Sequence, residues 1–531
     1  MHLGGEKMKA KLFLLIIVIS IGLVACAQEP DSKDDGGAND ATGGGDLTVD
    51  LASEPVSLDP HVANDGNSLY VMNAMYDTLV ELDKELQIQP GLAESFEQIE
   101  DTVWEAKLRK DVMFHDGSEL NAEVVKANLN RVLDPEIASP LGFLFDMIKS
   151  VEVIDDYTVH IITTYPFAAL PSHLAHPAGH MISLKSIEAD YEAIENGKPP
   201  FASVDEQPVG TGYFKYDDRK SGESITLVKN ENYWGEQAKI DRVTFKFVPE
   251  DNTRIAELTT GDADFIYPVN ANDISQIDAN EGTHVKQSDS SNLSYIGMNT
   301  EVEPFDDKRV RQAINMAIDK ESLIEGVLDG VALPAIGPLA PTVFGYSDEI
   351  DPITYDPDHA KALLKEAGYV DGFSVTILTN DRTTTETAEF VQAQLSEIGI
   401  DLEIERLETG AYLEITANGD TDMFVGSWGT VTLDADYGLY PMFHSTNTGA
   451  PGNRSFLAND EVDELLEKAR KATDDSERLS FYKEVQQVIV DEAPIVPLYH
   501  SVLLAGLGDN VKGFYQYPSS FPFLRDVTIE D

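Results

Sequence analysis

A strand-helix-strand pattern over residues 373–404 constrains the fold of this chain more than any other feature. Apolar residues alternate with others over 373–377 and again over 400–404, as in strands with one buried face. Between them, residues 384–398 carry apolar side chains at helical spacing, and Gly399 follows as a typical helix C-cap. A helix that connects two such strands makes a right-handed crossover, which leaves the strands parallel. The pattern therefore predicts a parallel β-α-β unit within an α/β fold.

Strand-like and helix-like segments follow one another over residues 47–530, which extends the α/β prediction to most of the chain. The patterns predict a strand over 47–51, a helix over 119–133, a hairpin over 151–161 and a helical stripe over 309–328. The chain is 42% hydrophobic. About 490 residues of this composition are enough for two or three domains with cores of their own.

The N-terminal region has the pattern of an export signal. Three lysines precede an apolar run over 12–24, and this run ends at Leu23-Val24-Ala25-Cys26. A run of about 13 residues, interrupted by Ser20 and Gly22, is too short to span a bilayer core. The four-residue run resembles the lipobox of bacterial lipoproteins, in which the cysteine is acylated and becomes the new N-terminus. We therefore expect residues 1–25 to be a lipoprotein signal peptide and Cys26 to be the lipidation site.

The segment after Cys26 fits a tether. Residues 31–45 hold Gly, Asp, Asn, Ser and Thr but no apolar residue larger than Ala, so they cannot bury surface. We expect residues 26–45 to be a flexible leash that holds the protein on the extracellular face of the cell membrane. The alternatives for the N-terminal run are an ordinary secretory signal with a chance cysteine, or a short buried segment. Cys26 is the only cysteine of the chain, so no disulfide stabilises the rest.

The charge of the chain excludes some partners. Its 94 acidic residues outnumber 38 basic ones, for a net charge of −56. A surface this negative disfavours nucleic acids and anionic membranes as direct partners. The acidic residues are dispersed in short groups such as Asp155-Asp156 rather than gathered in a tail, which is typical of a solvated surface.

Two loops are the main candidates for a ligand site. The first is Thr379-Asn380-Asp381-Arg382, where the first strand of the β-α-β unit ends and free backbone N–H groups can face an anion. Arg382 beside them can bind a carboxylate with two hydrogen bonds, although it could instead pair with Asp381 or Glu386. The second loop begins at Trp428 and runs to Asp436. Trp428 is flanked by Gly426, Ser427 and Gly429, which leave room around its ring. It is expected to form a pocket wall together with Tyr412; the alternative for both rings is a place in the core.

The sequence contains few motifs that are typical of an enzyme active site. The chain has no Gly-x-Ser-x-Gly, no phosphate-binding loop and no His-Glu-x-x-His, so we expect no catalytic residue and no cofactor. Gly210-Thr211-Gly212 is too short for a dinucleotide site and predicts a tight turn. An exported hydrolase that uses a carboxylate pair such as Asp434 and Asp436 remains an alternative, although such pairs arise by chance among so many acids.

Three histidines close together raise the question of a metal. His173 and His176 could lie on one helical face, with His180 nearby, but Pro177 and Gly179 interrupt the helix. We expect a polar loop with incidental histidines and no metal site. Binding of nickel or a metal chelate remains the alternative.

Several segments together carry a resemblance to a known family. They are Val56-Ser57-Leu58-Asp59-Pro60, Phe114-His115-Asp116-Gly117, Pro208-Val209-Gly210-Thr211-Gly212, Lys229-Asn230 with Tyr233-Trp234-Gly235, Arg309-Val310-Arg311-Gln312-Ala313-Ile314, Asp356-Pro357, and Ala493-Pro494-Ile495-Val496-Pro497-Leu498-Tyr499. In this order, over residues 46–531, the chain resembles the family 5 extracellular solute-binding proteins of ABC importers, the dipeptide, oligopeptide and nickel group. Its nickel-binding members keep the metal-chelate alternative open.

The resemblance implies a type II periplasmic-binding-protein-like fold with two lobes and an inserted subdomain in lobe I. By the chain order of the family, lobe I comprises 46–70, 208–293 and 498–531, the inserted subdomain 71–207, and lobe II 294–497. It further implies that the protein is a receptor rather than an enzyme. Its implied partners are a small peptide and the permease subunits of the transporter, and we expect a monomer.

Within the family, the chain is most similar to the glutathione-binding type. The similarity rests on Gly426-Ser427-Trp428, on 433–443 and on Pro451-Gly452-Asn453-Arg454-Ser455. Dipeptide-binding relatives carry an aspartate three residues after this tryptophan, which pairs with the peptide ammonium; here Val431 takes that position. We therefore expect a small peptide, glutathione-like, whose carboxylate is bound near Asn380 and Arg382 and whose ammonium is bound by Asp434 or Asp436.

Overall fold

A computed structural model describes residues 44–450 and 452–530 of the protein. The predicted signal peptide, Cys26 and nearly all of the tether therefore lie outside the described residues. Within the described part, no helix is both long enough and apolar enough to cross a membrane.

An eleven-stranded mixed sheet is the main element of the fold. Its strands are β1 (Asp46–Leu51), β8 (Phe214–Lys220), β9 (Ser224–Lys229), β10 (Arg242–Phe247), β11 (Phe265–Tyr267), β12 (Thr283–Met298), β13 (Ala332–Pro334), β14 (Phe373–Thr379), β15 (Ile400–Arg406), β16 (Met423–Gly429) and β17 (Ile495–Gly508). The strand order is β15-β14-β16-β12-β17-β11-β1-β10-β9-β8, with β13 paired to β17 at the side.

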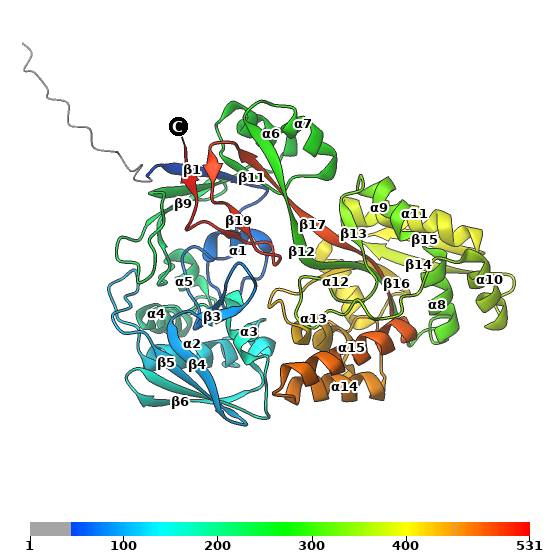
Figure 1. Ribbon diagram of the computed structural model, residues 1–531, viewed down its shortest axis with the longest axis horizontal. Coiled ribbons are helices and arrows are strands. Elements are labelled where there is room, and N and C mark those ends of the chain that lie inside the picture. Colours follow the sequence, from blue (N-terminus) through cyan, green and yellow to red (C-terminus); the bar gives the residue numbers. More distant parts are fainter. Residues whose placement is uncertain (1–43, 451, 531) are drawn as a thin grey trace, which may run out of the picture. The chain divides into compact units, whose positions relative to one another are not determined.

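Two long strands, β12 and β17, join the two halves of this sheet. They pair antiparallel over most of their length, with register shifts between Asp289 and Leu293 and between Ser294 and Tyr295. β16 adds to one side of this pair and β11 to the other, and both long strands can be followed from one half to the other in Figure 1. The predicted lobe boundaries, 293/294 and 497/498, fall inside these two strands.

A separate sheet carries the segment predicted as the inserted subdomain. It consists of β4 (Ala93–Glu100), β5 (Val103–Leu108), β7 (Thr158–Thr163) and β6 (Ile148–Asp155), all antiparallel. Three two-stranded pairs complete the strands of the described residues: β2 (Val80–Leu82) with β3 (Ile88–Pro90), β18 (Val511–Lys512) with β21 (Thr528–Ile529), and β19 (Tyr515–Gln516) with β20 (Pro522–Phe523).

The helices of the described residues are mostly short. They are α1 (Gly66–Met72), α2 (Ala122–Leu133), α3 (Leu170–Leu174), α4 (Leu184–Glu195), α5 (Ala202–Glu206), α6 (Asp251–Thr260), α7 (Ile274–Asp278), α8 (Lys308–Ala317), α9 (Lys320–Val327), α10 (Pro357–Glu366), α11 (Arg382–Glu397), α12 (Thr409–Asn418), α13 (Ala435–Phe443), α14 (Asp460–Lys471) and α15 (Asp475–Glu492).

The structure confirms the β-α-β unit. β14 and β15 are parallel, with Phe373 opposite Ile400 and Thr379 opposite Arg406, and α11 connects them. α11 begins at a capping box in which Asp381 and Thr384 each bond the other's backbone N–H. The predicted hairpin at Asp155-Asp156 is also present, as β6 and β7.

The stripe over 309–328 forms two helices, α8 and α9, rather than one. Asp319 accepts a hydrogen bond from the N–H of Ser322 and caps α9, while Ile318 leaves the helical conformation. An aspartate that caps a new helix interrupts a continuous apolar stripe, because its side chain replaces the carbonyl of the preceding turn.

Three of the buried cores of the described residues meet at the site described below. One core includes Leu47, Phe245 and Phe514 and is called the lobe I core, after the predicted lobe that supplies most of it. A second core, called the subdomain core after the predicted insertion, runs from Leu79 to Met181 and includes Tyr437. The remaining part has two cores, one around α8–α11 and one around α12–α15, here called the Trp-side core. Apolar burial on this scale supplies the main stabilising free energy of a chain without disulfides.

Candidate functional site

The loop that begins at Trp428 lies where three cores meet. β16 ends at Gly429, and the half-buried Trp428 ring packs against both the subdomain core and the Trp-side core. Val431, three residues on, packs against the lobe I core and the subdomain core. The Trp428 Nε1 donates to the Tyr437 carbonyl oxygen at 3.2 Å, which fixes the ring against α13. The loop therefore contacts three of the buried cores.

Asp434 and Asp436, at the start of α13, are both buried and paired with arginines. Nη2 of Arg478 lies 2.9 Å from each Asp434 carboxylate oxygen. Nε of Arg470 lies 2.9 Å from Oδ1 of Asp436. Burial alone would raise the pKa of Asp436, but Arg470 and His173 outweigh it and hold that pKa below the usual range. Any ligand ammonium that reached either carboxylate would share it with an arginine.

His173 links this helix to the inserted subdomain. Its Nε2 lies 3.1 Å from Oδ2 of Asp436, and its Nδ1 lies 2.8 Å from the Leu144 carbonyl oxygen. Each ring nitrogen of His173 therefore faces an oxygen that can accept a hydrogen bond. Arg470 adds a second link, because its guanidinium lies over the rings of Tyr165 and Phe167, at 5.8 and 5.0 Å.

Sequence reasoning missed the pairing of His173 with Asp436. The two residues are 263 positions apart, and no local pattern connects them. The available signals were a histidine in an apolar segment and an aspartate eight residues after Trp428. Of the other two histidines, His176 accepts from the Ala178 N–H at 2.9 Å and His180 stacks on Tyr76. Over residues 44–450 and 452–530, no three His, Cys, Asp or Glu side chains converge as metal ligands.

The loop after β14 and the Trp428 loop both follow the carboxyl ends of their strands, and these ends lie on the same side because β14 and β16 are parallel neighbours. Asp381 occupies the start of α11 by accepting from the Thr384 N–H at 2.8 Å. Arg382 is 81% exposed, and its Nε donates to Oε1 of Glu386 at 2.7 Å. This is the ion pair that was expected if Arg382 does not bind a ligand carboxylate. The half-buried Asn380 accepts from the hydroxyl of Thr384 at 3.4 Å.

Tyr412 supports the Trp428 strand from inside the Trp-side core. It is 5% exposed, and its hydroxyl donates to the Val425 carbonyl oxygen at 2.7 Å. The structure thus gathers Trp428, Asp434 and Asp436 in one loop, places Asn380 and Arg382 at the same sheet edge, and puts Tyr412 behind them.

Comparison with known proteins identifies the class. Residues 87–450 match the family description "Bacterial extracellular solute-binding proteins, family 5 Middle". The glutathione-binding protein GsiB of Shigella dysenteriae is 35% identical over 495 residues, which cover 91% of this chain and 94% of that protein. GsiB of Escherichia coli strain K12 is 34% identical over the same shares.

Solved structures agree with this match. The periplasmic binding protein DppA of Helicobacter pylori, in complex with the peptide STSA, is 32% identical with a TM-score of 0.81, over 92% of this chain and 99% of that one. HbpA2 of Haemophilus parasuis is 30% identical with a TM-score of 0.79, over 92% of this chain and 100% of that one. The mixed α/β fold of two lobes, together with these matches, defines this protein as a solute-binding protein. The chain belongs to the bacterial extracellular solute-binding proteins, family 5, which confirms the fold and the family expected from the sequence.

Proposed function

We propose that the protein captures a small, glutathione-like peptide outside the cell and delivers it to the permease of an ABC importer. The observation that carries the proposal is the position of Trp428 and Val431 against the cores of both lobes and the inserted subdomain. A loop that contacts all three parts can sense whether they have closed on a ligand. The glutathione-binding relatives and the peptide-bound DppA support this ligand class.

Trp428 and Arg382 are the proposed principal ligand contacts. Trp428 offers an apolar ring at the meeting point of the cores. Arg382 can leave Glu386 at little expense because exposed pairs of this spacing are weak. Asn380 would assist Arg382 at the ligand carboxylate. Tyr412 would act by holding β16 in place through its hydroxyl.

The ammonium of the ligand is proposed to be bound at Asp434 or Asp436. Both carboxylates are held in place by arginines, so they supply a fixed negative edge to the loop. The same pairing disfavours the hydrolase alternative, because a general acid needs a raised pKa and the pKa of Asp436 is lowered.

The proposal includes an anchor on the extracellular face of the cell membrane. Acylation of Cys26 would hold the mature protein there, with residues 26–45 as the leash that lets a monomer reach the permease.

Calorimetric titration tests the proposed ligand and its contacts. Wild-type protein should bind reduced or oxidised glutathione, or simple dipeptides, without turnover. Trp428→Ala and Arg382→Ala should each weaken binding by about tenfold or more, since each removes a buried contact of the bound peptide. Arg309→Ala is the matched control, because Arg309 is another exposed arginine paired with a nearby acid, Asp307.

Three outcomes would count against the proposal. An Arg382→Ala affinity within about twofold of wild type would place the carboxylate contact elsewhere. Equal losses in the Arg309→Ala control would show a general charge effect. Sustained peptide hydrolysis that Asp434→Asn abolishes would favour the hydrolase alternative.

A further inference from the structure

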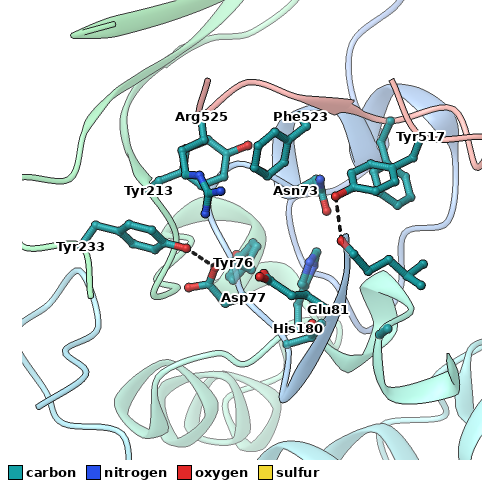
Figure 2. A pocket seen from close by; sticks show the side chains of 14 residues that line it. Asn73, Tyr76, Asp77, Glu81, His180, Tyr213, Tyr233, Tyr517, Phe523 and Arg525 are labelled. Carbon is teal, nitrogen blue, oxygen red and sulfur yellow. Dashed lines mark hydrogen bonds between the residues drawn. The ribbon is translucent and has the colours of Figure 1, made fainter. Parts of the chain in front are cut away.

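A cavity of about 60 Å³ lies away from the Trp428 loop, between the segment after α1, the strand β2 and the C-terminal segment. Figure 2 shows Glu81, His180, Tyr233, Tyr517 and Arg525 around it. None of its lining residues comes from 294–497, so it is separate from the proposed peptide contacts. Its size leaves room for only a few non-hydrogen atoms, far less than a tripeptide needs.

Two acidic side chains line the cavity, and they differ in how well they are satisfied. Asp77 accepts hydrogen bonds from Thr211 Oγ1, Tyr233 Oη and Trp234 Nε1, at 2.7, 3.1 and 2.9 Å. Glu81 makes no side-chain hydrogen bond or ion pair within the part of the chain that the structure describes. Burial, with a smaller contribution from Asp77, raises its pKa to about 7. Glu81 is therefore the carboxylate with free hydrogen-bonding capacity in this cavity.

Arg525 is the matching cation. Its buried Nε has no hydrogen-bond partner among the described residues, and its nearest carboxylate oxygen there belongs to Asp526, at 3.8 Å. Its charge acts on Glu81 and Asp77, yet it forms no ion pair with either. Nδ1 of His180, a side chain 3% exposed, also lacks a partner within 44–450 and 452–530. The cavity thus holds a carboxylate, Glu81, and a guanidinium, Arg525, that form no ion pair with each other, and the Arg525 Nε has no hydrogen-bond partner among the described residues.

Aromatic rings form the remaining walls. Tyr76, Tyr213, Tyr233, Tyr517 and Phe523 line the cavity, and the guanidinium of Arg525 lies 4.7 Å from the Phe523 ring centre. Ring faces attract ammonium groups, most strongly where water is excluded. The carboxylate of Glu81, the guanidinium of Arg525 and the ring faces together suit a small molecule that carries one positive and one negative charge.

We propose that this cavity binds a small zwitterion with one ammonium and one carboxylate group, such as a free amino acid of the size of glycine or alanine. Arg525 binds the carboxylate with two parallel hydrogen bonds, as guanidinium groups do. Glu81 and the ring of Tyr233 hold the ammonium. The bound molecule ties the C-terminal segment, through Tyr517 and Arg525, to β2.

Titration of the full chain with glycine, alanine and glycine betaine tests the site, with methylamine and acetate as single-charge controls. At least one zwitterion should bind, and Glu81→Gln and Arg525→Gln should each weaken it by about tenfold or more, because each removes a charged hydrogen-bond partner. Trp428→Ala should leave this binding unchanged, which separates the cavity from the peptide site. Hydrogen exchange over 515–525 should slow when the zwitterion is added.

Other results would overturn the inference. Absence of binding by every zwitterion up to millimolar concentration would do so, as would methylamine binding as tightly as glycine. Circular dichroism must show that the variants are folded. If Arg525→Gln does not fold, Arg525→Lys replaces it, and unchanged zwitterion affinity in both Glu81→Gln and Arg525→Lys would equally refute the site.

Discussion

Replacement of Arg131 by methionine should be among the most damaging single changes in the protein. Arg131 is fully buried on α2. Its Nη2 donates to Oδ2 of Asp59 and to Oδ2 of Asp190, both at 2.7 Å, and its Nη1 contacts Nδ1 of His61 at 2.9 Å. Methionine fills much of the same volume but leaves two buried carboxylates without their cation.

The expected loss of stability in Arg131→Met depends on the hydrogen bonds that the two carboxylates keep. Asp190 keeps backbone donors at Phe201 and Ser203, at 3.2 and 3.3 Å, and Asp59 keeps the His61 N–H at 2.9 Å. The negative charges remain uncompensated, and breaking a buried pair in this way typically costs about 3–5 kcal/mol. Burial raises the pKa of Asp59 even with Arg131 present. The loss should therefore shrink at acid pH, where protonation removes the charge.

Urea unfolding of the wild type and Arg131→Met, followed by circular dichroism, measures the difference in free energy of unfolding. Arg309→Met is the control, since it removes an exposed arginine instead. A loss below about 1 kcal/mol for Arg131→Met, or the same loss at neutral and acid pH, would refute the reasoning.

Three further predictions concern stability and anchoring. The pKa of Glu81 is raised to about 7 in the folded protein, so folding takes up a proton at pH values below that. The free energy of unfolding should therefore fall as pH rises from about 5 to 7. Unfolding of Glu81→Gln, measured at several pH values, should lack this dependence. Gly212→Ala should destabilise strongly, because its Cβ would lie 2.4 Å from the Met75 carbonyl carbon, whereas Gly66→Ala, with open space around it, should be nearly neutral in thermal unfolding. Cys26→Ser should release folded protein into the medium, and membrane-bound Cys26→Ser after signal cleavage would contradict the lipid anchor.

Local patterns predicted the elements well where burial repeats along one segment. The β-α-β unit from Phe373 to Arg406 was read from alternation and helical spacing, because both of its strands and its helix bury one continuous face. The stripe over 309–328 was predicted less well. Its apolar spacing continues through Asp319, and only the cap formed by that side chain reveals the break.

Contacts between segments far apart in the chain could not be predicted from the sequence. Arg131 meets Asp59 and Asp190, and His173 meets Asp436, because the fold brings these positions together, and no local spacing encodes either cluster. The candidate loops themselves were predicted, since strand ends mark the ligand edge of parallel units. The arginine partners of Asp434 and Asp436 could not be predicted from the sequence, because Arg478 and Arg470 lie on later helices.

Native mass spectrometry of the protein, purified from its host without unfolding, tests the central claim most directly. If the protein captures a small peptide at the Trp428 loop, the wild type should carry a mass excess equal to such a peptide. Trp428→Ala purified in parallel should have lost that excess. A wild type without any peptide, or a peptide that persists unchanged on Trp428→Ala, would contradict the claim.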